Sequence, residues 1–176
     1  MPTASSPSST TEPAVLGCRP ADGADELAWH FDLRRRVFVF EQGIFEFDDR
    51  DAHDDDERTL HVLGLVDGDV GGAVRLYPLD PSGELWKGDR LAVLPEHRAC
   101  HLGARLVRFA VATAGELGGR RMIAQIQLPN VRFFEHLGWS RSGDPSPFHG
   151  IEHQLMDIGL SPGGLSPGGL GPGPGR

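Results

Sequence analysis

The chain has 176 residues and a formal net charge of −8, with 25 acidic and 17 basic side chains. This negative balance argues against sequence-independent nucleic-acid binding, which needs a positive surface to displace counterions from phosphates. No apolar run is long enough to span a bilayer, and the first residues lack the basic and apolar regions of a signal peptide. Cys18 and Cys100 are far apart, which favours neither a disulfide framework nor a CxxC metal site. We expect a cytoplasmic protein without nucleic-acid, membrane or metal partners.

Composition divides the chain into one folded domain and two biased ends. Residues 1–13 are rich in Ser, Thr and Pro, and residues 159–176 repeat Leu-Ser-Pro-Gly-Gly before Gly-Pro-Gly-Pro-Gly. Neither end has enough apolar side chains to offset the entropy of ordering, so both are predicted to be disordered. We interpret the tail as an inert extension, with a linker or docking segment as the alternative. Residues 14–158 make a single domain of ordinary size.

The first elements of the domain are predicted to be a short strand and a helix. The strand covers residues 15–19, and either Asp22 or Asp25 can cap the helix that follows. The helix presents apolar residues to the core at helical spacing: Leu27, Phe31, Leu33 and Val37. Residues 46–57 then form an acidic loop.

A hairpin and a strand–helix unit are predicted next. Apolar strands at 60–66 and 69–79 flank Asp67-Gly68, a dipeptide typical of tight hairpin turns. Residues 90–94 form the following strand. Apolar side chains then recur at helical spacing through residues 102–117, where a Gly-Gly pair stops the helix.

The last elements complete a sheet flanked by helices. Residues 122–128 alternate as in a strand, so that Gln125 and Gln127 share one face. A short helix from Asn130, a Leu-Gly-Trp turn and a final strand at 151–158 follow. Together these elements predict an α/β domain built on a mixed sheet.

The segment from the predicted strand 90–94 into the next helix carries the clearest functional signal. It passes through a Pro-Glu-His-Arg turn, so the first backbone N–H groups of the helix are exposed. These groups, with the helix dipole behind them, form a cradle for phosphate, and Arg98 and Arg105 add positive charge. The segment predicts a binding site for a phosphorylated cofactor.

This segment resembles motif A of the GCN5-related N-acetyltransferases. The pyrophosphate loop of that family reads Arg or Gln, two residues, Gly, one residue, then Gly or Ala. The matching run is Arg98-Ala-Cys-His101-Leu-Gly103, in which His101 stands where the family usually has its first Gly. Glycine permits a positive φ and a close backbone approach, both of which a histidine resists.

Other segments are similar to the same family in the expected order. Residues 35–42 resemble the corresponding segment of the ElaA-like acetyltransferases and, more distantly, of the acyl-homoserine-lactone synthases, and an acidic loop follows in both cases. His61, motif A, the Gln125 strand and the run Phe133-Phe134-Glu-His-Leu-Gly-Trp139 come next. The resemblance implies the acyl-CoA N-acyltransferase fold, an α/β (α+β) architecture whose mixed, mostly antiparallel central sheet is flanked by helices.

The resemblance also implies acetyl-CoA, or another acyl-CoA, as the co-substrate. Its pantetheine arm would lie in a notch where the motif A strand splays from the strand 122–128, against the backbone of Leu91, Ala92 and Val93. Those donors would also stabilise the oxyanion that forms during attack. The remaining cofactor-binding residues implied are Arg98, His101, Leu102, Gly103, Ala104 and Arg105. The alternative is that the strand 90–94 is an ordinary buried strand, and both interpretations can hold together.

Transfer to an amine needs a base or a water chain to deprotonate the ammonium group. Glu41 and His61 are the candidate catalytic residues. The alternatives are that His61 is a structural hydrogen-bonding group and that Glu41 closes the first helix through backbone or arginine contacts. Phe134 stands where this family often has a tyrosine that protonates the departing thiolate, and phenylalanine cannot donate a proton.

Substrate contacts are predicted in two places. The acidic loop packs eight carboxylates into residues 46–57 and could attract a cationic amine, with Glu46 and Asp48 matching the Glu-x-Asp pattern of the ElaA-like subgroup. The alternatives are a solvated, self-repelling loop and, with a poorer fit, a calcium site. Gln125 and Gln127 either orient substrate or pantetheine or occupy a polar sheet face.

We therefore predict an acyl-CoA-dependent N-acyltransferase, of the N-acetyltransferase type, that acts on the amine of a small molecule. A homodimer is left open. The alternative is a CoA-binding regulatory or partner protein with little turnover, which His101 and Phe134 favour. A third interpretation, an acyl-homoserine-lactone type of synthase, predicts a long acyl carrier and S-adenosylmethionine.

Overall fold

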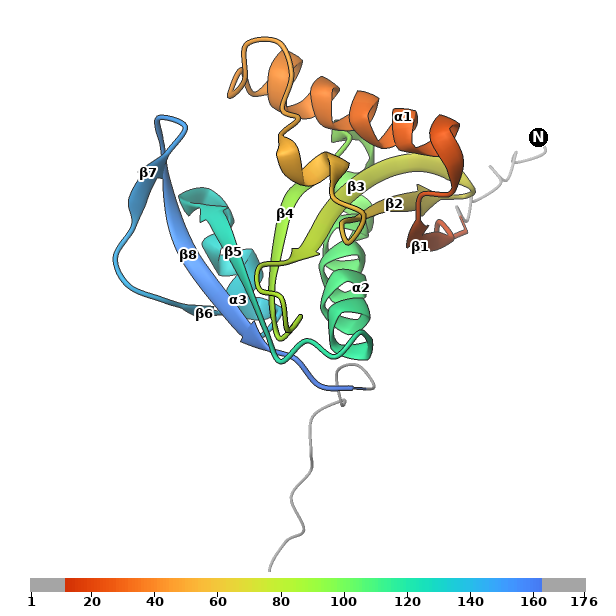
Figure 1. Ribbon diagram of the computed structural model, residues 1–176. Coiled ribbons are helices and arrows are strands. Elements are labelled where there is room, and N and C mark those ends of the chain that lie inside the picture. The colour runs from red at the N-terminus through yellow and green to blue at the C-terminus, as the bar shows by residue number, and fades with distance from the viewer. Residues whose placement is uncertain (1–11, 163–176) are drawn as a thin grey trace, which may run out of the picture.

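A computed structural model of the chain describes residues 12–162 (Figure 1). Residues 1–11 and 163–176, which hold most of the two ends predicted to be disordered, lie outside the described residues. The described part forms an eight-stranded sheet in the order β1-β2-β3-β4-β5-β8-β6, with β7 paired to β8. Among the strands of residues 12–162, only the pair β4 and β5 is parallel. The predicted α/β fold with a mixed, mostly antiparallel sheet is confirmed.

The strands and helices follow in chain order. The strands are β1 (Leu16–Pro20), β2 (Leu60–Val66), β3 (Asp69–Pro78), β4 (Leu85–Val93), β5 (Arg121–Gln127), β6 (Ser140–Arg141), β7 (Ser146–Phe148) and β8 (Ile151–Gly159). The α-helices are α1 (Gly23–Arg35), α2 (Leu102–Glu116) and α3 (Val131–His136). Shorter helical turns are η1 (Arg36–Glu41), η2 (Ala52–Asp55), η3 (Pro95–Cys100) and η4 (Leu128–Asn130). No helix within residues 12–162 is long and apolar enough to cross a membrane.

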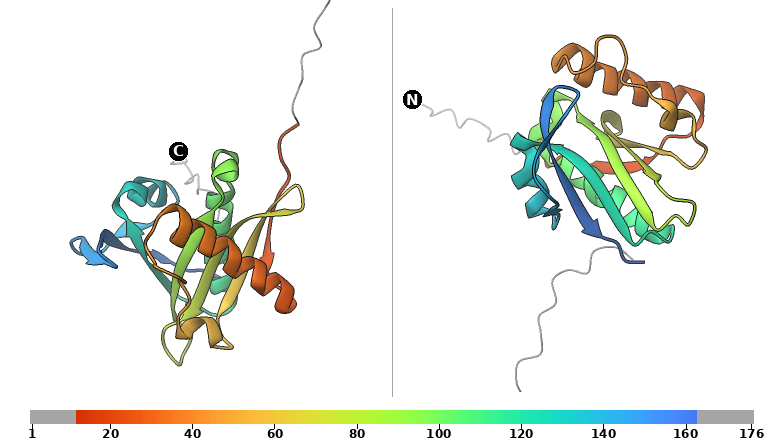
Figure 2. Two further views of the ribbon diagram at one scale, coloured as in Figure 1. Left: turned by 90° about the horizontal axis from the view of Figure 1, so that it is seen from above. Right: turned by 60° about the vertical axis from the view of Figure 1, so that its left-hand side comes forward.

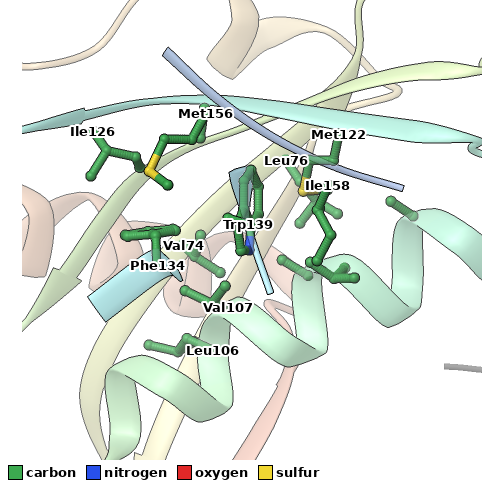
Figure 3. Close-up of a cluster of buried hydrophobic side chains, with 14 of the residues drawn as sticks. Val74, Leu76, Leu106, Val107, Met122, Ile126, Phe134, Trp139, Met156 and Ile158 are labelled. Carbon is green, nitrogen blue, oxygen red and sulfur yellow. The ribbon is translucent and has the colours of Figure 1, made fainter. Parts of the chain in front are cut away.

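Helices cover both faces of the sheet (Figure 2). The face toward α1, here called the α1 face, holds a small apolar cluster that includes Leu33, Val37 and Ala92. The opposite face, the α2 face, packs against α2 and α3 through a larger core, in which Trp139 lies between α2 and the strands with Phe134 beside it (Figure 3). Because strand side chains alternate, β3 and β4 contribute to both clusters.

The first helix is present, but the residues that it buries differ in part from those predicted. Leu33 and Val37 are buried as expected, but the neighbouring buried positions are His30 and Arg34. The chain then continues into the π-helical turn η1, a type of turn that is frequent at functional sites. The α1 face of the sheet is therefore partly polar inside, which the apolar spacing alone did not indicate.

The strand predicted at 90–94 is wrong in extent, because β4 begins at Leu85. A β-bulge interrupts its pairing with β3: Ala73 pairs with Ala92, whereas Arg75 pairs with Asp89. The bulged segment of β4, between Asp89 and Ala92, contains Arg90, whose φ is 53°. A bulge bends the strand and re-aims its side chains, so that the consecutive Asp89 and Arg90 both reach the ion pairs described below.

The strands β4 and β5 pair only at one end. Leu85–Lys87 lies beside Arg121–Ile123, and beyond this point the two strands diverge, as Figure 1 shows. The backbone edges of Gly88–Val93 and of the later part of β5 therefore face each other without pairing. The C-terminal boundary of the domain lies slightly past the predicted residue 158, because β8 extends to Gly159 and Leu160 packs on the core.

Candidate active site in the notch between β4 and β5

A cavity of about 140 Å³ occupies the notch between the diverging strands. Its lining on the α2 face is apolar and comes from the core: Val74, Val107, Ala110, Met122, Ala124, Ile126, Phe134 and Trp139. Its lining on the α1 face is mostly polar or aromatic: Phe45, Lys87, Asp89, Arg90, Gln125, Gln127, Phe148 and His153. The notch thus joins an apolar compartment to a polar one across the sheet.

The predicted pantetheine-binding residues lie along the free edge of β4. Leu91 lines the cavity, and Ala92 and Val93 continue the strand toward α2. Ala92 is buried against the α1 face. The backbone carbonyl of Val93 accepts a hydrogen bond from Arg98 Nε over 3.1 Å. The predicted geometry, with a strand edge left open by splaying, is present.

The predicted phosphate loop comes together at the N-terminus of α2. His101 is the N-cap residue of this helix and adopts the left-handed conformation, with a φ of 65° and a ψ of 17°. Leu102 is fully buried, so it offers only its backbone, and Ala104 follows in the first turn. A Cβ added to Gly103 would meet its neighbours only at ordinary contact distances of 3.7 Å or more. His101 thus adopts the left-handed backbone conformation that glycine usually provides at this position, and this conformation costs roughly 1–2 kcal/mol of stability for a residue with a side chain.

The two arginines predicted at this loop differ in their surroundings. Arg105 lines a separate surface hollow between α2 and β1, together with Cys18, His101 and Arg108. Burial raises the pKa of the Cys18 thiol to about 11, despite the nearby positive charge of Arg105. Arg98 instead lies beside the end of η1.

Glu41 ends η1 and forms an ion pair with Arg98, with 2.7 Å between Oε2 and Nη2. The hydrogen bond from Arg98 lowers the pKa of the Glu41 carboxyl below its ordinary value. Glu41 is not among the residues that line the cavity. The environment therefore moves this carboxylate away from the raised pKa that a carboxylate base needs.

His61, the other predicted catalytic residue, also lies outside the cavity lining. Its Nε2 is 3.1 Å from Asp54 Oδ1, and its ring packs edge-on against that of His30 with 5.0 Å between centroids. The structure thus places His61 in a polar cluster under α1, in agreement with the structural alternative. Its catalytic role stays a prediction.

The inner part of the acidic loop is folded, because Asp49, Asp51 and Asp54 pair with arginines from α1, β3 and β4. The other carboxylates of the loop are mostly exposed, as the alternative of a solvated loop predicts. Three arginines and four aspartates form what we call the arginine–aspartate cluster: Arg34, Arg75, Arg90, Asp49, Asp51, Asp54 and Asp89. Arg34 donates to Asp49 over 2.8 Å and to Asp54 over 2.7 Å. Arg75 donates to Asp89 over 2.8 Å. Asp51 and Asp54 also form a capping box at η2.

Two carboxylates of the cluster, Asp51 and Asp54, have a pKa below the ordinary value and are held in the charged form. Burial by itself would raise the pKa of Asp54, but hydrogen bonds from His61 and Arg34 outweigh it and hold this pKa well below the usual range. Charges that are already paired attract a cationic substrate only weakly. Glu46 and Asp48, the two predicted substrate contacts in this loop, are exposed and do not line the cavity.

Gln125 and Gln127 are where the sequence predicts them, on one face of β5 and at the cavity wall. Gln127 donates to Gln42 over 3.2 Å. The Oε1 atom of Gln125 is buried and has no hydrogen-bond partner within residues 12–162. Leaving a buried acceptor unpaired costs roughly 1–3 kcal/mol, which marks this position as one to explain.

Lys87 and His153 are among the lining residues that were not identified as site residues from the sequence. His153 lies on β8 opposite Gln127, and its Nδ1 is 2.7 Å from the carbonyl oxygen of Ile151. Because a carbonyl can only accept, Nδ1 carries the proton, and Nε2 keeps its lone pair in the neutral ring. The sequence offered one signal for His153. If the final strand had been paired with the predicted strand 122–128, the alternation of side chains would have placed His153 on the same face of the sheet as Gln127.

Residues 25–139 match the family model described as "Acetyltransferase (GNAT) family". The chain belongs to this family. A Bacillus subtilis (strain 168) protein provisionally named as an acetyltransferase is 29% identical over 129 residues, which is 72% of this chain and 84% of that protein. The resemblance to the GCN5-related acetyltransferases is confirmed, and with it a transferase that acts on acyl groups.

Solved structures show the same fold at low sequence identity. Escherichia coli ElaA has a TM-score of 0.71 and 20% identity, covering 82% of this chain and 98% of that chain. The CoA-dependent acyl-homoserine lactone synthase BjaI, solved with SAM and isopentyl-CoA, has a TM-score of 0.67 and 20% identity, covering 84% and 83% respectively. Within residues 12–162, no group of three or more His, Cys, Asp or Glu is placed to hold a metal ion.

Proposed function

We propose that this protein is an acyl-CoA-dependent N-acyltransferase that transfers an acetyl group from acetyl-CoA to the amine of a small molecule. The observation that carries the proposal is the notch between β4 and β5, which combines an open strand edge with a cavity, and the chain leads from this strand through η3 into the N-terminus of α2. An extended arm can pair with the strand edge, while the N-terminus of α2 suits the diphosphate. The family membership supports acyl-CoA as the co-substrate.

Acyl transfer in this site requires an amine to attack the thioester carbonyl carbon. The nitrogen lone pair forms the new C–N bond, and collapse of the tetrahedral intermediate breaks the C–S bond and releases the CoA thiolate. Backbone N–H groups near the β4 bulge, at Leu91, are suited to stabilise the oxyanion, an effect worth ~3 kcal/mol or more in other acyl-transfer enzymes. The strain at Arg90 fits the tendency of unusual backbone conformations to gather at active sites.

We propose His153 as the base that takes the ammonium proton of the acceptor. It lines the cavity, whereas Glu41 and His61 do not. Its Nδ1 hydrogen bond to Ile151 fixes the ring and leaves Nε2 as the atom that can accept a proton. Glu41 and His61 remain the alternatives, and a water chain would be needed to connect either of them to the cavity.

No tyrosine lines the cavity to protonate the leaving thiolate. Phe134 lies at the cavity wall and has no hydroxyl, and the hydroxyl of Tyr77, the only tyrosine in the chain, donates to Asp89. Burial raises the pKa of Tyr77 well above its ordinary value. A thiol pKa of about 8.5 allows expulsion as the thiolate near neutral pH, so transfer does not depend on a tyrosine.

The experiment that tests the proposal follows release of the free thiol from acetyl-CoA with a panel of primary amines, beside calorimetric titration of CoA. We expect both binding and amine-dependent thiol release. Binding without release for any amine would support the alternative, a CoA-binding regulatory protein, for which His101 and Phe134 are the favouring features. Absence of CoA binding would contradict both functions.

A further inference from the structure

The charges at the cavity are unequally compensated. Three charged residues line it: Lys87, Asp89 and Arg90. Asp89 accepts two hydrogen bonds from Arg75, over 2.8 and 2.9 Å. Arg90 lies 3.0 Å from Asp49 and 3.2 Å from Asp51. These two charges are thus balanced by partners from the arginine–aspartate cluster.

Lys87 is the exception. No carboxylate in the part of the chain that the structure describes lies within ion-pair distance of its ammonium group. The Nζ atom lies 5.9 Å from the centroid of the Phe148 ring, on the α1 face of the sheet. The polar compartment of the cavity therefore carries one positive charge without a counterion.

The position of Lys87 separates this charge from the predicted diphosphate site. Lys87 pairs with Ile123 at the closed end of the notch, whereas the phosphate loop follows Val93 at the open end. Six residues of extended strand span roughly 20 Å. A diphosphate bound at the N-terminus of α2 is thus too distant for Lys87 to contact, and the charge faces whatever binds on the α1 face.

We propose that Lys87 binds a carboxylate of the acceptor, so that the enzyme acylates amino acids or amino-acid-like amines. This inference rests on the proposed function and specifies its substrate class. A carboxylate supplies the missing counterion, and the buried Oε1 of Gln125 offers an acceptor for the amine N–H once the amide turns toward the ligand. The inner aspartates of the acidic loop are paired already and therefore attract a cation only weakly.

The test compares matched acceptors that differ only at the carboxylate. Thiol release from acetyl-CoA is measured with a panel of amino acids and with the corresponding amino-acid amides, for the wild type, Lys87→Met and Lys87→Arg. For the wild type we expect kcat/KM to be ten- to a hundredfold higher with the carboxylate, as is typical of a charge-assisted hydrogen bond. Lys87→Met should reduce this ratio to near one, and Lys87→Arg should retain most of it.

The readouts distinguish failure of this inference from failure of the proposed function. CoA affinity should be the same in Lys87→Met and wild type, which also shows that the variant is folded. Transfer to amines with no preference for the carboxylate, or with a preference for the amides, overturns the role of Lys87 and leaves the acyltransferase intact. Loss of CoA affinity in Lys87→Met also overturns it. CoA binding without transfer to any amine refutes the proposed function itself.

Discussion

The guanidinium of Arg98 donates to the carboxylate of Glu41 over 2.7 Å and to the carbonyl of Val93 over 3.1 Å. The ion pair joins the end of η1 to the predicted phosphate loop. Arg98, predicted to bind the cofactor, and Glu41, predicted to be catalytic, are therefore bonded to each other. Arg98 is still about half exposed, which leaves part of its fork available to an anion.

The first prediction concerns this arginine. Arg98→Ala should weaken CoA binding by about tenfold or more, because it removes a charge-assisted hydrogen bond at the diphosphate. Calorimetric titration of CoA measures the effect. Glu41→Gln breaks the same ion pair but keeps the guanidinium, so it should change CoA affinity by no more than about threefold. If both variants bind CoA as the wild type does, Arg98 is not at the phosphate site.

A second prediction follows from the backbone of His101, which occupies the left-handed region at the N-cap of α2. Replacement by glycine should stabilise the fold by about 0.5–1 kcal/mol, because the relief of strain exceeds the added entropy of the unfolded chain. Urea denaturation measures the free energy of unfolding. Gly103→Ala is the matched control and should fold normally, since its Cβ has room. A destabilised His101→Gly variant would show that the imidazole itself supports the loop.

The third prediction separates structural from substrate-binding carboxylates in the acidic loop. Asp54→Asn should destabilise the protein by roughly 3 kcal/mol, because it leaves Arg34 and Arg75 with an incomplete set of buried partners. Asp48→Asn, at an exposed position, should change stability by less than about 0.5 kcal/mol. Chemical denaturation of both variants gives the comparison. Equal stability of the two would contradict the structural role of the cluster.

The sequence predicts most of the fold, because periodicity and turn residues report on local structure. The β2–β3 hairpin and the start of α2 at Leu102 are found where the patterns place them. The alternation that puts Gln125 and Gln127 on one face of β5 is observed as well. The family resemblance added the splayed strands, which no local pattern contains.

What the sequence did not predict depends on contacts between distant segments. The ion pairs of Asp49, Asp51 and Asp54 could not be predicted from the acidic run, because their arginine partners lie on α1, β3 and β4, up to 41 residues away. The early start of β4 was missed because Lys87, Gly88 and Asp89 interrupt its apolar pattern and the bulge shifts the alternation. His153 and Lys87 became visible as site residues only when β4, β5 and β8 were placed side by side.

The fourth prediction is a loss of stability in mild acid through His30. This ring is buried, and burial, with the positive charge of Arg34 nearby, lowers its pKa to about 3. Between a pH of about 6.5 and a pH of about 3, His30 is therefore protonated in the unfolded chain but not in the folded protein. Because only the unfolded state binds this proton, the free energy of unfolding falls as the pH is lowered through this range. The slope from this group is at most about 1.4 kcal/mol per pH unit.

His30→Gln provides the control for this effect, because the glutamine amide can still donate to the carbonyl of Val74, as Nε2 of His30 does over 3.2 Å. Urea denaturation at several pH values between 7 and 4 should show a shallower dependence in the variant. Asp54, whose pKa is lowered, adds a further loss only below a pH of about 4 in both proteins. The same slope in variant and wild type would show that His30 does not exclude the proton.

The last prediction concerns His153. His153→Gln keeps an amide that can donate to Ile151 but removes the atom that accepts the ammonium proton, so kcat should fall by about 10²–10⁴-fold while CoA affinity is kept. If deprotonation is the lost step, the variant should recover activity as the pH rises and the free acceptor amine becomes neutral. His61→Gln and Glu41→Gln, assayed over the same pH range, should lose less. A larger loss in either of these, with a normal pH profile in His153→Gln, would transfer the role of base to that residue and leave His153 as part of the cavity wall.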